Sequence, residues 1–171
     1  AGHSVAQFNY GQMIIGDRPT SRGIKLALGY YEKAAIRKRP GTVGICAAIM
    51  HRYGVDAVPH LLCGGFTKED TENALIDLNF LNINNVLALR GDARKFDGKF
   101  IGEPDGHKFA VDLVTQINDI NNGKYLDKNI ENGVPTDFCI GIAGYPEKHF
   151  ESPNLATDLA FAKQKVDAGA N

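Results

Sequence analysis

The sequence is poor in several features, and each shortage argues against a class of protein. There is no Trp, and the only three cysteines, Cys46, Cys63 and Cys139, form no CxxC pair, which favours a reduced, cytoplasmic compartment. No apolar run approaches the roughly 18 to 20 residues of a membrane span, and no signal peptide is recognisable at the start. Because 19 Lys and Arg balance 20 Asp and Glu, there is no broad field for nucleic acid or acidic membranes. The sequence therefore predicts a cytoplasmic protein that binds neither.

What is present suffices for a folded domain. The 171 residues are 43% hydrophobic, and a chain of this length buries about 70% of its surface on folding. Glycine is the one excess, at 19 residues against a usual share of about 7%. This excess indicates tight turns or backbone that lies close to a ligand.

From about residue 56 onward, short apolar segments alternate with segments of helical periodicity. The apolar runs at 57–63, 86–89 and 138–143 predict three strands. Because these runs are continuously apolar, we expect both faces of the sheet to be covered. Strand–helix–strand alternation predicts a parallel sheet with right-handed crossovers.

The intervening segments carry helix signals. Thr67, with Asp70 three residues later, predicts a capped helix start. Ser152 followed by Pro153 predicts the start of the last helix. An earlier segment, 42–50, also favours a helix. The expected apolar stripes are Ala74, Leu75, Leu78 and Leu81; Phe109, Ala110, Leu113, Val114 and Ile117; and Leu155, Leu159, Ala162 and Val166, with Gly169 as the last stop.

Chemistry-bearing side chains gather where the predicted strands end. They are His60, the run Arg90-Gly91-Asp92, and the segment 145–149 with its Tyr145 and His149. Because the carboxyl ends of parallel strands meet at one edge, we expect a functional site there. Each also has a structural alternative: a core histidine, a turn with a local ion pair, and a structural turn followed by exposed side chains.

Other kinds of site have less support. His60, Asp92, Glu147 and His149 are acceptable metal ligands, but no HxH or HExxH spacing joins them. No GxSxG elbow, phosphate loop or GxGxxG turn is present. Cys63 and Cys139 lie in apolar strands, where a thiol tends to be inert. A metal-dependent barrel hydrolase therefore stays a third alternative.

Four motifs, in order and at matching spacing, resemble the bacterial methylenetetrahydrofolate reductase family. They are Ala57 to Cys63, Leu89 to Asp92, Ala143 to His149 and Lys165 to Asn171. The resemblance covers residues 37–171 and leaves 1–36 unassigned. It implies an α/β fold, a TIM (β/α)8 barrel of which this chain holds only part. It also implies FAD-dependent reduction of 5,10-methylenetetrahydrofolate to 5-methyltetrahydrofolate with NADH or NADPH, in one-carbon metabolism and methionine biosynthesis, by a homo-oligomer.

The resemblance also assigns roles to matching residues. Asp92 takes the catalytic position, where its negative charge disfavours anionic reduced flavin and stabilises a cationic folate. No metal ligand is implied. The implied FAD-binding residues are His60, Arg90, Gly91, Asp92, Phe109, Ala110, Tyr145, His149, Asp158 and Lys165.

Some family positions differ. Phe161 and Gln164 replace an asparagine and an arginine found in some members, and Phe109 stands where tyrosine is common. The first-strand motif with its acid glutamate has no recognisable copy in residues 1–35, where Glu32 is a poor substitute. The sequence also stops at Asn171, before a strand whose glutamine engages folate. A non-catalytic binding or structural fragment of the same fold is therefore the alternative function.

Overall fold

The computed structural model describes residues 41–93 and 98–171. The predictions for 1–36 and for Glu32 lie outside the described residues. The chain divides into two compact units, residues 1–55 and Asp56–Asn171. In the first unit the described element is helix α3 (Gly41–Tyr53), which confirms the helix predicted over 42–50.

The second unit is built on a three-stranded parallel sheet, as the strand–helix alternation predicts. Its strands are β1 (His60–Leu62), β2 (Asn85–Leu89) and β3 (Cys139–Ile142), in the spatial order β1-β2-β3. His60 lies opposite Leu87, and Leu87 lies opposite Gly141. Strands β1 and β3 are shorter than the apolar runs that predicted them, and β2 begins one residue earlier than its run, but sheet type and chain order are confirmed.

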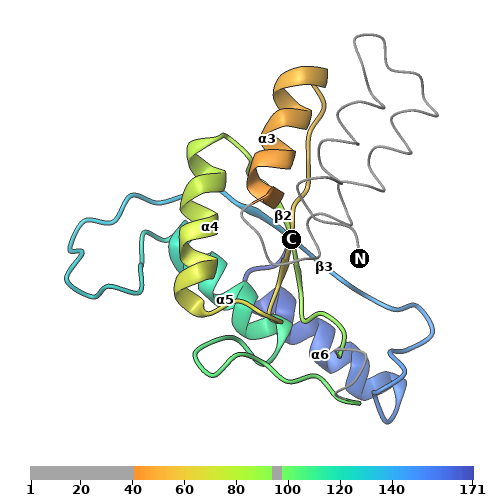
Figure 1. The fold of residues 1–171 in the computed structure, drawn as a ribbon. Coiled ribbons are helices and arrows are strands. Elements are labelled where there is room, and N and C mark those ends of the chain that lie inside the picture. Colours follow the sequence, from red (N-terminus) through yellow and green to blue (C-terminus); the bar gives the residue numbers. More distant parts are fainter. Residues whose placement is uncertain (1–40, 94–97) are drawn as a thin grey trace. The chain divides into compact units, whose positions relative to one another are not determined.

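Three helices follow the strands: α4 (Lys68–Phe80), α5 (Ala110–Asn121) and α6 (Leu155–Asp167). Helix α5 contacts β2 and β3 and lies between α4 and α6 (Figure 1). Three side chains of the predicted apolar stripe are fully buried, Leu113, Val114 and Ile117, and so is Ile120, which the stripe did not include. The core of this unit is the layer between α5 and the sheet.

The predicted capping box at the start of α4 is confirmed. The Thr67 hydroxyl accepts a hydrogen bond from the Asp70 N–H at 3.0 Å, and the Asp70 carboxylate accepts one from the Thr67 N–H at 3.0 Å. Two backbone donors that have no partner inside the helix are thereby satisfied. Such a cap stabilises a helix by about 1 kcal/mol.

The expectation that both sheet faces are covered is wrong. On β2, Val86 and Ala88 are buried, whereas Leu87 and Leu89 are only half-buried. Because neighbouring side chains on a strand point to opposite faces, the helices described in Asp56–Asn171 cover one face only. The opposite face carries half-buried or exposed side chains, including the exposed His60.

The predictions for the last helix need two corrections. Asn154, not Ser152, caps α6: its side chain accepts from the Thr157 N–H at 2.8 Å. Leu155, Leu159 and Val166 of the predicted stripe are exposed, and no residue of α6 is buried. Ser152 loses the cap because its hydroxyl bonds Asp158 instead. The stop near Gly169 is confirmed, since α6 ends two residues before it.

Candidate site at the carboxyl edge of the sheet

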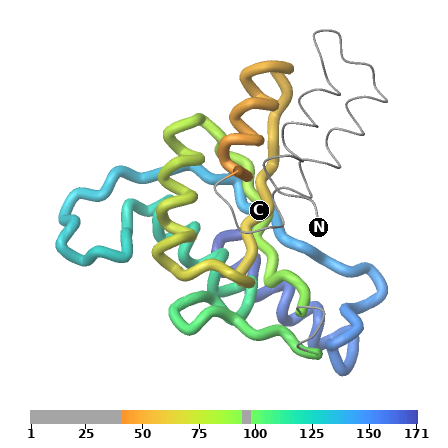
Figure 2. Tube along the Cα trace, viewed as in Figure 1, coloured from red at the N-terminus to blue at the C-terminus, as the bar shows by residue number. Residues whose placement is uncertain are grey.

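The rim of the sheet is formed by three segments that follow β1, β2 and β3. Arg90, Gly91 and Asp92 come directly after β2, and the 98–109 loop then leads to α5. Residues 143–154 lead from β3 to α6. In Figure 2 the green 98–109 loop and the blue segment before α6 lie at the same end of this unit. The clustering that the sequence predicts at this edge is therefore present for the segments after β2 and β3.

Arg90 is the most connected of the predicted site residues. Its Nη1 lies 2.7 Å from Glu151 Oε2, and its guanidinium carbon lies 5.4 Å from the centre of the Phe100 ring. The hydrogen bond that Arg90 donates to the Glu151 carboxylate raises the pKa of Arg90, and the same bond lowers the pKa of Glu151. Both groups are therefore charged at neutral pH. Neither Phe100 nor Glu151 is predicted as a site residue from the sequence, because no motif marks them.

Gly91 and Asp92 complete the turn after β2. Gly91 has φ of +85°, in the left-handed region that a side chain disfavours. A residue with a Cβ would strain this turn and displace Arg90 or Asp92. Asp92 is exposed, and its charge contributes to the raised pKa of Arg90, so the two lie close enough to interact.

Tyr145, His149 and Asp158 form one cluster after β3. The Tyr145 and His149 rings meet edge to face with centroids 4.8 Å apart. Asp158 accepts hydrogen bonds from the His149 N–H at 2.9 Å and from the Ser152 hydroxyl at 3.0 Å. These bonds, the His149 one foremost, lower the pKa of Asp158. One carboxylate at the start of α6 thus fixes the conformation of the rim loop.

This cluster is linked to Arg90 through the backbone of Glu151. The Glu151 N–H donates to His149 Nδ1 at 3.2 Å. His149 Nδ1 is therefore an acceptor, which assigns the proton of the neutral ring to Nε2. The residues Arg90, Glu151, His149 and Asp158 form a continuous series of contacts from the end of β2 to α6.

Lys165 reaches this edge from the last turn of α6. Its ammonium donates to the Ala143 carbonyl at 2.8 Å, directly after β3. Burial lowers the pKa of Lys165, and the charge of Asp158 partly opposes that effect. Lys163, by contrast, is exposed and pairs with Asp167 at 2.6 Å, as expected for a solvated face.

Phe109 and Ala110 lie at the start of α5. Phe109 is the residue before the helix and is 59% exposed, so its placement in the buried stripe is wrong. Its N–H donates to the Asp112 carboxylate at 3.0 Å. Ala110 is the first residue of the helix and is half-buried.

The position of His60 also needs correction. His60 is the first residue of β1, not its carboxyl end, and it lies opposite Leu87, three residues before Arg90. Its exposed side chain belongs to the uncovered face of the sheet, which also contradicts the core-histidine alternative. No contact joins His60 to the Arg90 series among the interactions of the described residues.

An open hollow of about 630 Å³ lies beside Arg90. Its lining combines cations with aromatic rings and two carboxylates: Arg90, Lys99, Lys108, Phe100, Phe109, Glu103 and Glu151. Aromatic faces and guanidinium or ammonium groups suit a ligand that has both a flat ring system and negative charge.

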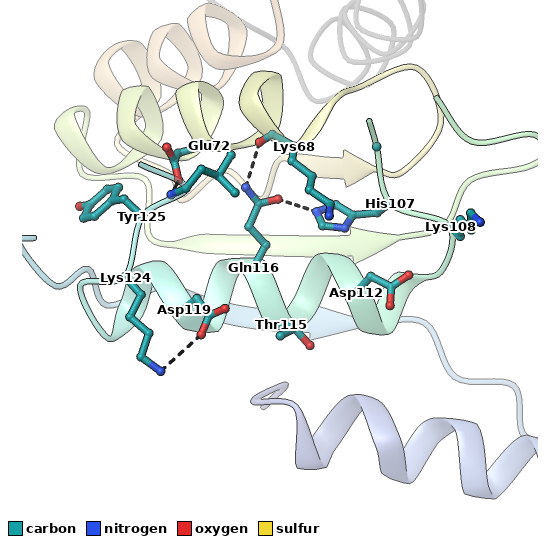
Figure 3. A pocket seen from close by; sticks show the side chains of 12 residues that line it. Lys68, Glu72, His107, Lys108, Asp112, Thr115, Gln116, Asp119, Lys124 and Tyr125 are labelled. Atoms are coloured by element: carbon teal, nitrogen blue, oxygen red, sulfur yellow. Dashed lines mark hydrogen bonds and ion pairs between the residues drawn. The ribbon is translucent and has the colours of Figure 1, made fainter. Parts of the chain in front are cut away.

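A second hollow, of about 470 Å³, lies between α4 and α5 and contains none of the predicted site residues. Figure 3 shows Gln116 at its centre, bridging His107 and the Lys68 backbone. The Gln116 amide donates to the Lys68 carbonyl at 2.9 Å and its oxygen pairs with His107 Nε2. These hydrogen bonds connect the 98–109 loop to α4 and α5. They therefore help to hold the part of the rim that this loop forms.

The cysteines differ from one another. Burial raises the pKa of Cys63 to about 12, consistent with an inert thiol. Cys139 lies in β3, as predicted, but it is exposed at the start of that strand, so burial does not make its thiol inert. No group of three or more metal-ligand side chains occurs among residues 41–93 and 98–171. Within those same ranges, no helix is long and apolar enough to cross a membrane.

Comparison with known proteins identifies the family. The family model described as methylenetetrahydrofolate reductase matches residues 28–171. "Methylenetetrahydrofolate reductase (NADH) 1" of Arabidopsis thaliana is 37% identical over 139 residues, 76% of this chain and 21% of that protein. The "5,10-methylenetetrahydrofolate reductase" of Escherichia coli is 34% identical over 134 residues, 78% of this chain and 38% of that protein.

The name of a third relative contains NADPH, whereas that of the Arabidopsis thaliana protein contains NADH. "Probable methylenetetrahydrofolate reductase (NADPH)" of Caenorhabditis elegans is 33% identical over 141 residues, 82% of this chain and 19% of that protein. The chain thus spans between about a fifth and two fifths of the length of these three relatives. By the family model and these identities, the chain belongs to the methylenetetrahydrofolate reductase family.

Proposed function

We propose that this protein reduces 5,10-methylenetetrahydrofolate to 5-methyltetrahydrofolate, with FAD as its cofactor and NADH or NADPH as the reductant. Family membership supports the reaction, and the names of relatives include both nicotinamide nucleotides. A single observation carries the FAD assignment: a series of residues in mutual contact lies beside a hollow that is lined by aromatic rings and cations. The residues of this series are Arg90, Glu151, His149 and Asp158.

The residues present fit a flavin dinucleotide. Arg90 and Lys165 are the cations that would bind its phosphates, because charge-assisted hydrogen bonds are the strong ones for such groups. Phe109 and Tyr145 are exposed aromatic rings at the same edge and can stack on a flat ring system. His60, Gly91 and Ala110 complete the proposed contacts. FAD, when bound, supplies hydride transfer.

Asp92 is the proposed catalytic residue. It is an exposed carboxylate at the end of β2, two residues from Arg90. Its negative charge would stabilise a cationic form of the folate and oppose negative charge on the reduced cofactor, which is an electrostatic contribution to the reaction. Asp92 needs no proton transfer for this role.

We also propose that the fold is part of a (β/α)8 barrel and that residues 37–171 form its FAD-binding region. The sequential order of three parallel strands supports a barrel, as does the sheet face that the helices do not cover. At the free edge of β3, the Asn171 N–H donates to the Ile140 carbonyl at 3.0 Å, and the Asn171 side chain accepts from the Ile140 N–H. Asn171 thus occupies the position that a next parallel strand takes in a barrel. Homo-oligomerisation and a cytoplasmic location stay predictions.

A titration of the full chain with FAD tests the cofactor assignment. We expect quenched flavin fluorescence on binding, and about tenfold weaker binding for Lys165→Met. Lys163→Met is the matched control, since it removes the same charge from the same helix at an exposed position. Absence of FAD binding, or equal behaviour of the two variants, would contradict the assignment.

A turnover assay tests the reaction itself. We expect methylenetetrahydrofolate-dependent oxidation of NADH or NADPH and formation of 5-methyltetrahydrofolate. Asp92→Asn should lower the rate by about tenfold or more while FAD stays bound. FAD binding without any methyl product would instead favour the alternative function, a non-catalytic fragment of the same fold.

A further inference from the structure

The Arg90 guanidinium is held from two sides by Phe100 and Glu151, to which the function proposed above assigns no contact with the cofactor. The Phe100 ring lies 5.4 Å from its central carbon, within the range of a cation–π contact. Glu151 Oε2 lies 2.7 Å from Nη1, the length of a charge-assisted hydrogen bond. The Arg90 side chain is only 28% exposed, so its freedom is restricted by neighbours as well as by these two contacts.

Phe100 is itself fixed. A Cβ placed on Gly64, two residues after β1, would lie 3.3 Å from the Phe100 ring, so the ring rests against bare backbone. The loop that carries Phe100 is anchored farther along, because the Lys68 N–H donates to the Asp105 carbonyl at 2.9 Å. His107 and Gln116 add the buried contact seen in Figure 3. Phe100 therefore presents a stable face to Arg90.

Glu151 is fixed through its backbone. Its N–H donates to His149 Nδ1, and the Ser152 N–H that follows donates to the His149 carbonyl at 3.0 Å. Arg90 lowers the pKa of Glu151, so the carboxylate is ionised at neutral pH. Its side chain is 46% exposed, and exposed ion pairs add little to stability. The Arg90–Glu151 pair therefore contributes little to the stability of the fold.

Within residues 41–93 and 98–171, the contacts of Arg90 leave most of its guanidinium donors available. Arg has five N–H donors, and Glu151 engages one nitrogen, Nη1. Arg90 and both of its partners line the same hollow. A free arginine side chain loses rotamer entropy when it binds a ligand. An arginine that is already oriented loses less.

We propose that Phe100 and Glu151 are positioning residues for cofactor binding, which orient the Arg90 guanidinium so that its remaining donors face the phosphate-bearing flavin cofactor. This inference rests on the proposed function, because it assumes that Arg90 binds that cofactor. Neither residue needs to contact the cofactor itself. Their effect is transmitted through Arg90 alone, which makes it separable by experiment.

The test is a double-mutant cycle on the affinity of the full chain for FAD. Glu151→Gln should weaken binding about three- to fivefold, and Glu151→Ala more, because Gln keeps an acceptor near Nη1. Phe100→Leu should weaken it about two- to threefold. In an Arg90→Met background both changes should have no further effect, since the residue through which they act is gone.

Matched controls separate positioning from general effects. Glu131→Gln removes the same charge at an exposed position, and Phe80→Leu makes the same change at a ring that is 84% exposed. Both should leave FAD affinity unchanged, and all variants should keep the melting temperature of the cofactor-free protein. Two results would overturn the inference while the proposed function stands. In one, Glu151→Gln changes FAD affinity no more than Glu131→Gln does; in the other, Glu151→Gln still weakens FAD binding in the Arg90→Met background. A wild-type chain that binds no FAD overturns both.

Discussion

Helices α5 and α6 are nearly equal in length, and an apolar stripe predicts each of them, yet they differ in burial. Helix α5 places five side chains in the core, including Leu113 and Ile117 at 0% exposure. Helix α6 buries none, and Leu159 on its stripe is 59% exposed. Periodicity therefore predicts that a helix forms, but a covering neighbour decides whether its stripe enters a core. Helix α5 has neighbours on both sides and a sheet beneath it, whereas α6 contacts α5.

The two helices also contribute differently to the site. Buried Gln116 of α5 anchors the 98–109 loop from behind. Asp158 and Lys165 of α6 bond the segment after β3 directly. Helix α5 is thus mainly a core element, and α6 is mainly an element of the rim.

The largest expected effect tests the burial difference. Ile117→Ala in α5 should lower the free energy of unfolding by about 3 kcal/mol, because it leaves a cavity in a fully buried position. Leu159→Ala in α6 should lower it by less than about 1 kcal/mol. Denaturant unfolding of both variants measures the difference. Similar losses would show that α6 is as well covered as α5.

A smaller effect is expected from a polar pair. Gln116→Ala removes two hydrogen bonds and leaves His107 and the Lys68 carbonyl without their partner, at a cost of about 2 kcal/mol. Gln164→Ala, an exposed glutamine on α6, is the matched control and should cost less than about 0.5 kcal/mol. Thermal and denaturant unfolding report both. If Gln116→Ala were as stable as Gln164→Ala, that result would contradict the role of Gln116 in anchoring the 98–109 loop.

The smallest and most local effect concerns Asp158. Its pKa lies below the ordinary 3.8 in the folded protein, so its carboxylate stabilises the rim loop above about pH 3.8 and loses that effect as the pH falls through the lowered pKa. In Asp158→Asn, hydrogen exchange of the His149 amide should be about three- to tenfold faster at neutral pH.

The pH dependence and a control sharpen that experiment. The difference between wild type and Asp158→Asn should shrink below about pH 3.8, because the wild-type carboxyl then becomes neutral as well. Asp167→Asn, at the exposed end of the same helix, should leave the His149 amide unchanged at every pH. Equal exchange in wild type and Asp158→Asn at neutral pH would contradict the proposed role of Asp158 in the loop.

The sequence predicts a helix cap correctly where both residues that form the cap lie close together in the chain. Thr67 and Asp70 cap α4 because both partners lie within one turn of each other. The same kind of signal failed at Ser152, where two cap-forming residue types stand close together. Asn154 forms the cap because Asp158, four residues into the helix, takes the Ser152 hydroxyl.

The sequence by itself determined the order of strands and helices, the parallel sheet, the family, and the location of Arg90, Asp92, Tyr145 and His149 near one edge. These follow from periodicity, short-range capping and motifs, all of which are written in neighbouring residues. Only the tertiary structure decided that His60 begins its strand, that the described helices of Asp56–Asn171 cover one sheet face, and that Phe100 and Glu151 hold Arg90. Those outcomes depend on contacts between segments far apart in the chain, where packing, not local preference, selects the partner.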